Sequence, residues 1–246
     1  MDAATIIGMA MLMAIAAALY SSVGHGGASA YLAIMALFSV APATMRPTAL
    51  ALNLLVAGFG AWRYWSKGLS NWKLVLAFAI TATPAAYLGG SIHLPDHIYK
   101  PLVGILLWLA AVRLLWQPAM LAERPVHMPS LAITLPTGAA LGLLAGLTGT
   151  GGGIFLSPLI ILLAWEEPRH TSGVAAAFIL LNSAAGLAGN FASVGNLPRE
   201  LPVFLAAVAA GALVGTWLGV ERLPRPWLLR ALGLVLAIAG AKLLFT

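Results

Sequence analysis

The sequence Thr148-Gly149-Thr150-Gly151-Gly152-Gly153 decides how this chain folds. It separates a long apolar segment, 130–147, from a short one, 154–165. So many glycines interrupt a helix, because glycine loses more conformational freedom in a helix than other residues do. The stretch therefore predicts a break inside the apolar sequence, followed by a new and short helix.

The first half of the chain contains a matching break, Ser21-Ser22-Val23-Gly24-His25-Gly26-Gly27. This break also lies between a long apolar segment, 3–20, and a short one, 28–41. A shift of 126 residues places Gly26-Gly27 on Gly152-Gly153. The correspondence predicts two structural repeats joined by a proline-rich linker, with the boundaries 1–116, 117–129 and 130–246.

The composition around the breaks is that of a membrane protein. Of the 246 residues, 61% are hydrophobic and only 8% are charged, whereas a soluble domain carries about 25% charged residues. We therefore expect an all-α polytopic membrane protein whose partner is the lipid bilayer. Its formal charge of +6 then reports on loop topology and does not indicate nucleic-acid binding.

Ten apolar segments can be marked along the chain: 3–20, 28–41, 47–65, 72–90, 98–116, 130–147, 154–165, 172–193, 200–220 and 227–245. A helix needs about 20 residues to cross a hydrocarbon core of about 30 Å, so 28–41 and 154–165 are too short to cross alone as regular helices. If all ten segments cross, nine Lys and Arg residues lie on one side and four on the other; if the short ones do not, the split is seven to six. Because cytoplasmic loops carry the basic excess, ten crossings with both termini outside is the better interpretation.

Five crossings per repeat is an odd number, so the second repeat enters the membrane from the opposite side. The result is an inverted pair of five-segment repeats, each with a half-length helix after its glycine break. In transporters built on this plan, the substrate site lies between the repeats near the bilayer midplane. We therefore expect the two breaks to share a hollow there.

The chemistry of the breaks favours a small oxyanion. The first backbone N–H groups of a helix have no partner within the helix, and the helix dipole adds about half a positive charge at that end. Such a terminus binds anions, and hydroxyls such as those of Ser22, Ser29, Thr148 and Thr150 would add donors. The alternative is that the glycines only form tight turns between helices.

Three further polar side chains lie within the apolar sequence. Asn53 and Asn182 occupy matching segments of the two halves, three residues out of register, and each is either a ligand-facing donor or a tie between helices. His25 is an ionisable group that we place inside the membrane, where an imidazole with an ordinary pKa of about 6.5 would donate to an anion or carry a proton. The expected substrate-binding residues are Ser22, Gly24, His25, Gly26, Gly27, Asn53, Thr148, Gly149, Thr150, Gly151, Gly152, Gly153 and Asn182.

Charged residues lie at the edges of the apolar segments. All seven acidic residues fall in expected loops or at the terminus, which disfavours cation transport because no carboxylate remains at depth. Arg46 and the Arg169-His170 pair follow Pro42 and Pro168, and we interpret them as anchors at the membrane surface. Attraction of anions to the mouth of a path is the alternative.

The break and the apolar run after it, Gly149-Thr150-Gly151-Gly152-Gly153-Ile154-Phe155-Leu156-Ser157-Pro158-Leu159, resemble the sulfite exporter TauE/SafE family. The resemblance covers nearly the whole chain, and the second half matches better, since His25 interrupts the glycines of the first half and Leu32 stands where Pro158 would fall. It implies a secondary transporter, an exporter of small oxyanions such as sulfite or organosulfonates, in the bacterial cytoplasmic membrane. The resemblance does not fix the anion.

Other classes of function have weaker support in the sequence. An intramembrane serine hydrolase would need a nucleophile, a base and an orienting group, and beyond Ser22 and His25 no third group is visible, so we expect no enzyme. A non-transporting scaffold or assembly protein and a carrier of small carboxylates remain alternatives. We expect no cofactor and no metal site, and we keep a homo-oligomer open.

Overall fold

The computed structural model describes residues 2–22, 24–115, 125–221 and 226–245. Within these ranges the chain forms ten α-helices and one 3-10 helix, and no strand occurs among them. The elements are α1 (Ala3–Ser21), α2 (Ala28–Leu37), α3 (Pro42–Ser66), α4 (Trp72–Ser91), α5 (Asp96–Leu115), α6 (Leu131–Thr148), α7 (Gly153–Leu162), α8 (Pro168–Gly189), η1 (Phe191–Asn196), α9 (Leu201–Glu221) and α10 (Pro226–Phe245).

The expected all-α polytopic membrane protein is confirmed. Five of the described helices are long and apolar enough to cross a membrane. Large apolar side chains point outward from these helices, among them Met11 (62% exposed), Leu76 (63%) and Ile80 (68%). Such a surface suits contact with lipid tails rather than water. Most of the linker 117–129 lies outside the described residues, and its last five residues form no helix.

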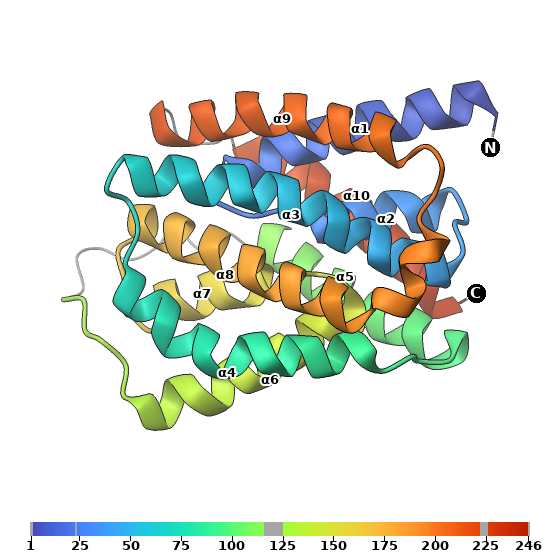
Figure 1. The fold of residues 1–246 in the computed structure, drawn as a ribbon. Helices are drawn as coiled ribbons and strands as arrows, with labels where there is room; N and C mark the ends of the chain where they lie inside the picture. Colours follow the sequence, from blue (N-terminus) through green and yellow to red (C-terminus); the bar gives the residue numbers. More distant parts are fainter. Residues whose placement is uncertain (1, 23, 116–124, 222–225, 246) are drawn as a thin grey trace.

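The helix order is the same in both halves: long, short, long, long, long. The packing partners are exchanged between the halves, because α1 packs against α9 and α6 packs against α4. Helices at equivalent positions of the two halves also pack together: α3 packs against α8, and α5 packs against α10. Both chain termini lie at the same end of the bundle (Figure 1), as an even number of crossings requires.

Glycines let the exchanged helices approach closely. A Cβ atom added to Gly142 would overlap the carbonyl oxygen of Ala82, so α6 and α4 touch through their backbones. In the same way, a Cβ atom on Gly211 or Gly215 would overlap a carbonyl oxygen of α1. Close backbone contact of this kind is typical of packed membrane helices, and it holds each half against the other.

Candidate functional site

Each break ends in a glycine with left-handed backbone, and a short helix begins there. Gly27 (φ 92°) is the N-cap of α2, and Gly152 (φ 78°) is the N-cap of α7. Both helices have 10 residues, or about 15 Å, which is half of a hydrocarbon core of about 30 Å. Each leads through a short turn into a long helix, α3 or α8. Neither short helix is therefore long enough to cross such a core alone.

Asn53 joins the two breaks. Its Oδ1 accepts a hydrogen bond from the Ala28 N–H at 3.1 Å, at the start of α2. Its Nδ2 donates to the carbonyl oxygen of Thr150 at 3.5 Å, in the second break, and to Ser183 Oγ at 3.3 Å. The Asn53 side chain is fully buried. An amide at this depth is thus paired on both of its polar atoms, and it links one repeat to the other.

Ile179 of α8 is the counterpart of Asn53 on the other side of the junction. A Cβ atom added to Gly26 would lie 3.1 Å from Ile179 Cγ2, and one added to Gly151 would lie 2.9 Å from the same atom. Positions 53 and 179 differ by 126, the shift that superposes the two breaks in the sequence. The same place in both repeats therefore touches both breaks, with an amide from one half and an apolar side chain from the other.

The start of α2 keeps unpaired backbone donors. The Ala28 N–H bonds to Asn53 Oδ1, and the Tyr31 N–H bonds to the Gly27 carbonyl at 3.0 Å. The N–H groups of Ser29 and Ala30 have no acceptor within the described ranges of the chain. Both residues are buried, so bulk water does not reach these donors.

The start of α7 also has two backbone N–H groups without an acceptor among the described residues. Its first N–H groups to find an acceptor are those of Phe155 and Leu156, which both bond to the Gly152 carbonyl at 3.2 Å. Among the described residues, none accepts from the N–H groups of Gly153 and Ile154. A buried helix end without partners is what a bound ligand satisfies.

The hydroxyls expected to serve a ligand bond within the protein in this conformation. Ser22 Oγ donates to the Leu19 carbonyl at 2.7 Å, and Thr148 Oγ1 donates to the Leu144 carbonyl at 2.6 Å. Thr148 and Thr150 also bond to each other at 3.0 Å. Because Thr148 has a single hydroxyl hydrogen, Thr150 is the donor in that pair. The free donors are thus chiefly backbone N–H groups.

Two buried polar side chains, those of Tyr31 and Asn182, have no partner in the described part of the chain. The hydroxyl of Tyr31 is fully buried, and a Cβ atom added to Gly27 would lie 2.6 Å from it. Both amide atoms of Asn182 are buried and unbonded. Asn182 lies one turn beyond Ile179 on α8, so the three-residue mismatch seen in the sequence is real, and Ile179 takes the position equivalent to Asn53.

His25 lies inside the first break and is buried, with 8% of its surface exposed. Its ring packs edge-on against Tyr20, with the ring centroids 6.0 Å apart. The hydroxyl of Tyr20 in turn accepts a hydrogen bond from Ser29 Oγ at 3.0 Å. The imidazole therefore lies next to the start of α2 within a polar group contributed by α1 and α2.

Arg46 is buried within the protein, whereas Arg169 is exposed. Arg46 is only 5% exposed, and its guanidinium donates to the carbonyls of Ile92 at 2.8 Å and Gly89 at 2.6 Å, and also to that of Gly90. These carbonyls end α4, where the helix dipole favours a cation. The signal in the sequence was a single arginine within an otherwise apolar helix.

Arg46 also borders the second break. A Cβ atom added to Gly149 would lie 3.3 Å from the Cα and the Cγ of Arg46. The hydroxyl of Tyr99 donates to the Thr148 carbonyl at 3.1 Å on the same side. No carboxylate in the described ranges lies within 4 Å of the guanidinium, so a formal positive charge remains close to the end of α6.

The junction is closed by direct contact between its residues. A Cβ atom added to Gly26 would overlap Asn53 Oδ1, and one added to Gly151 would lie 2.6 Å from Asn53 Nδ2. Two hollows of about 400 and 550 Å³ lie elsewhere on the described surface and include no residue of either break. The expected meeting of the breaks is present, but the hollow expected between them is filled by Asn53 and Ile179.

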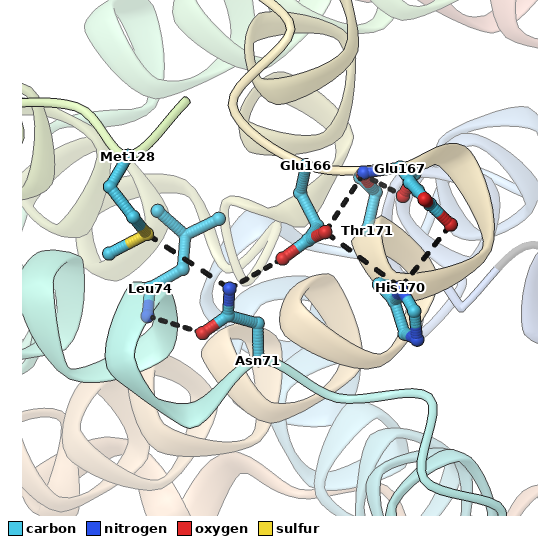
Figure 2. Close-up of polar contacts among 7 residues, drawn as sticks. All are labelled: Asn71, Leu74, Met128, Glu166, Glu167, His170 and Thr171. Atoms are coloured by element: carbon cyan, nitrogen blue, oxygen red, sulfur yellow. Dashed lines mark hydrogen bonds and ion pairs between the residues drawn. The ribbon is translucent and has the colours of Figure 1, made fainter. Parts of the chain in front are cut away.

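A separate polar cluster lies at the ends of helices, away from the breaks (Figure 2). Glu166 accepts hydrogen bonds from Asn71 Nδ2 at 2.5 Å and from the Glu167 N–H at 3.0 Å. Asn71 Oδ1 caps α4 by accepting from the Leu74 N–H at 3.2 Å. His170 Nδ1 lies 3.8 Å from Glu166 and 3.7 Å from Glu167. The cluster ties the start of α4 to the start of α8.

Two half-length helices that begin at glycine breaks, between halves with exchanged packing partners, are typical of a polytopic membrane transporter with broken helices. Residues 9–243 match the family Sulfite exporter TauE/SafE. The chain belongs to this family, and it is a multi-pass protein of the bacterial inner membrane.

Curated relatives agree with this class. The chain is 40% identical over 243 residues, 97% of this chain and 98% of the relative, to the probable membrane transporter protein y4hK of Sinorhizobium fredii (strain NBRC 101917 / NGR234). It is 29% identical to the probable membrane transporter protein YjnA of Bacillus subtilis (strain 168), over 92% of this chain and 95% of the relative. No solved structure matches the chain significantly.

Proposed function

We propose that this protein is a secondary transporter that exports small oxyanions, such as sulfite or organosulfonates, across the cytoplasmic membrane. The observation that carries the proposal is the pair of buried helix starts, at α2 and α7. Each has two N–H groups that lack acceptors among the described residues, and Asn53 bonds to both breaks. An anion with several oxygens would accept from both helix starts at once. Backbone N–H groups bind the negatively charged oxygens of an anion, so they suit sulfite and sulfonates alike.

The charges around the junction favour an anion over a cation. Arg46 places a buried positive charge beside the second break. The acids Asp96, Glu166 and Glu200 lie at helix starts or in the turns before them. A helix start also carries a partial positive charge. A cation at the junction would meet three repulsive contributions, from Arg46 and from the two helix starts, and among the described residues no carboxylate pairs with Arg46.

Two bundles that each combine helices of both repeats are the bodies that would move, because α1 packs against α9 and α4 packs against α6. Alternating access in inverted-repeat transporters is a rocking of one repeat or bundle against the other around a fixed central site. Here the closed junction corresponds to a state without access from either side. Separation of α3 from α8 would withdraw Asn53 from the second break and expose the N–H groups of both short helices.

Flux into liposomes tests the proposal. The purified full chain is reconstituted and assayed with sulfite, sulfate, thiosulfate, sulfoacetate, taurine, acetate and lactate, each with and without a pH gradient. We expect saturable flux of at least one oxyanion above protein-free liposomes, and sulfonate or sulfite flux above carboxylate flux. Flux restricted to acetate or lactate would support the carboxylate alternative, and absence of any flux would support a scaffold.

A matched variant controls for reconstitution. Gly8 of α1 has nothing within 4 Å of an added Cβ atom, so Gly8→Ala is expected to transport as the unmodified chain does. A loss of flux in Gly8→Ala would show that the assay reports folding or insertion and not the junction.

A further inference from the structure

The amide oxygen of Asn53 stands where a ligand oxygen would stand. It accepts from the Ala28 N–H, the first N–H of α2, at 3.1 Å. The orientation of the amide is fixed by its partners, because an N–H group on one side requires the oxygen there and the Thr150 carbonyl on the other requires the nitrogen. A neutral oxygen from the protein itself therefore occupies one donor at the positive end of the α2 dipole.

A second observation marks this helix start as a ligand site. The Tyr31 hydroxyl is fully buried, has no hydrogen-bond partner within the described residues, and points at the N-cap Gly27. Burying a hydroxyl without a partner costs free energy. Together with the unpaired N–H groups of Ser29 and Ala30, it gives the start of α2 three donors that Asn53 does not use.

The two helix starts differ in this respect. At the start of α7 the equivalent position is Ile179, whose side chain packs against Gly153 and offers no acceptor. The first N–H groups of α7 consequently find no acceptor in the described ranges, whereas the first N–H of α2 bonds to Asn53. The hydrogen bonding of the two helix starts thus differs because of one pair of residues at matching positions of the repeats, Asn53 and Ile179.

We infer that Asn53 is an internal substitute for the substrate: its amide oxygen holds the place of an anion oxygen at the Ala28 N–H, and an oxyanion that uses this first N–H of α2 together with the three other donors binds only by displacing it. This inference rests on the proposed function and assigns Asn53 as a positioning residue that competes with the anion. The displaced amide also loses its bonds to Thr150 and Ser183. Anion binding and release of the tie between the repeats are therefore one event.

Replacement of Asn53 by alanine tests the competition through the sign of its effect. If part of the protein is held in the tied form, the apparent Kd for the anion equals the intrinsic Kd divided by the fraction that is not tied. One hydrogen bond of about 1–1.5 kcal/mol corresponds to a population ratio of about tenfold. We expect Asn53→Ala to bind radiolabelled sulfite about tenfold more tightly than the unmodified full chain in detergent. Weaker binding would show that Asn53 is a ligand and would overturn the inference.

Position 179 supplies the complementary variant. Ile179→Asn would place a second amide against the start of α7, where it can accept from the unbonded N–H groups. We expect it to weaken sulfite binding about tenfold, by the same competition, while the matched control Ile179→Leu changes binding less than twofold. Unchanged or tighter binding by Ile179→Asn would overturn the inference, and this variant decides the question if Asn53→Ala does not fold.

A readout without anion separates this inference from the proposed function. We expect the Ala28 amide to exchange its hydrogen at least tenfold faster in Asn53→Ala than in the unmodified chain, because its acceptor is gone. An unchanged exchange rate would show that the tie does not exist. If the unmodified chain binds none of the oxyanions tested, the proposed function fails and the competition with it, whatever the exchange rate.

Discussion

Tyr31 places a buried phenolic hydroxyl at a helix start, and its removal separates function from stability. Tyr31→Phe removes an unpaired polar atom from the interior, so the thermal unfolding temperature is expected to stay equal or rise. The same change removes a donor to the anion. Because a hydrogen bond to a charged group contributes about 1.5–3 kcal/mol, the apparent Kd for the transported anion should rise at least about tenfold.

The measurement for Tyr31→Phe is a pair of titrations, one of anion binding and one of thermal unfolding, on the same detergent sample. Loss of affinity together with an unchanged unfolding temperature fits a ligand-facing hydroxyl. Unchanged affinity would remove Tyr31 from the site and leave its hydroxyl without a role.

Arg46 is expected to matter for both stability and charge. Arg46→Gln would abolish charge-assisted hydrogen bonds to the carbonyls that end α4. We expect it to lower the free energy of unfolding by about 2 kcal/mol, part of the bond energy being offset because the buried charge is also removed. Arg46→Lys keeps the positive charge but lacks the planar fork of donors. If Arg46→Lys retains anion affinity and Arg46→Gln does not, the positive charge at position 46 acts on the anion.

Some of the individual site residues could be predicted from the sequence, and others could not. The glycines and Asn53 could be found because they interrupt an apolar pattern. Ile179 could not, since an isoleucine in an apolar helix carries no signal, and only the fold shows that it shares a junction with Asn53. Arg46 carried the signal of a charge in an apolar helix, but burial against the end of α4 depends on packing that the sequence does not reveal.

At the scale of the elements, glycine spacing sets how closely α6 approaches α4. Gly142→Ala is expected to destabilise the protein by about 1–3 kcal/mol, as overpacking does, because the new Cβ atom would overlap the Ala82 carbonyl oxygen. Gly8→Ala is the matched control, since alanine favours a helix by about 1 kcal/mol over glycine and meets nothing within 4 Å there. Opposite shifts in unfolding temperature are expected.

Equal stability of Gly142→Ala and Gly8→Ala in the same detergent would show that α4 and α6 can separate without cost. The close backbone contact would then have no part in holding the repeats together.

Helix positions were predictable from the sequence because length and hydropathy decide them in a bilayer. The short helices agree with the segments after each break, and α3 and α8 begin at Pro42 and Pro168, before the apolar runs that mark them in the sequence. Proline is favoured in the first turn of a helix, so the helix starts there and carries polar residues such as Arg46 and Thr171 into the protein. Hydropathy alone cannot show this extension.

At the scale of the whole molecule, the repeats exchange packing partners, and the central junction lies where α3 and α8 pack against each other. The order of helices could be predicted from the sequence shift of 126 residues. The closure of the junction could not, because a filled centre and an open hollow have the same hydropathy pattern. Transport would require the two halves to exchange a closed junction for one open to either side.

The most direct test of the central claim, that both helix starts bind one anion, is solution NMR of the full chain with ¹⁵N-labelled alanine and glycine. The account predicts that the amide signals of Ala30 and Gly153 shift during a sulfite titration with a common midpoint, because one anion reaches both helix starts. Shifts at neither amide, at one alone, or with separate midpoints would contradict it.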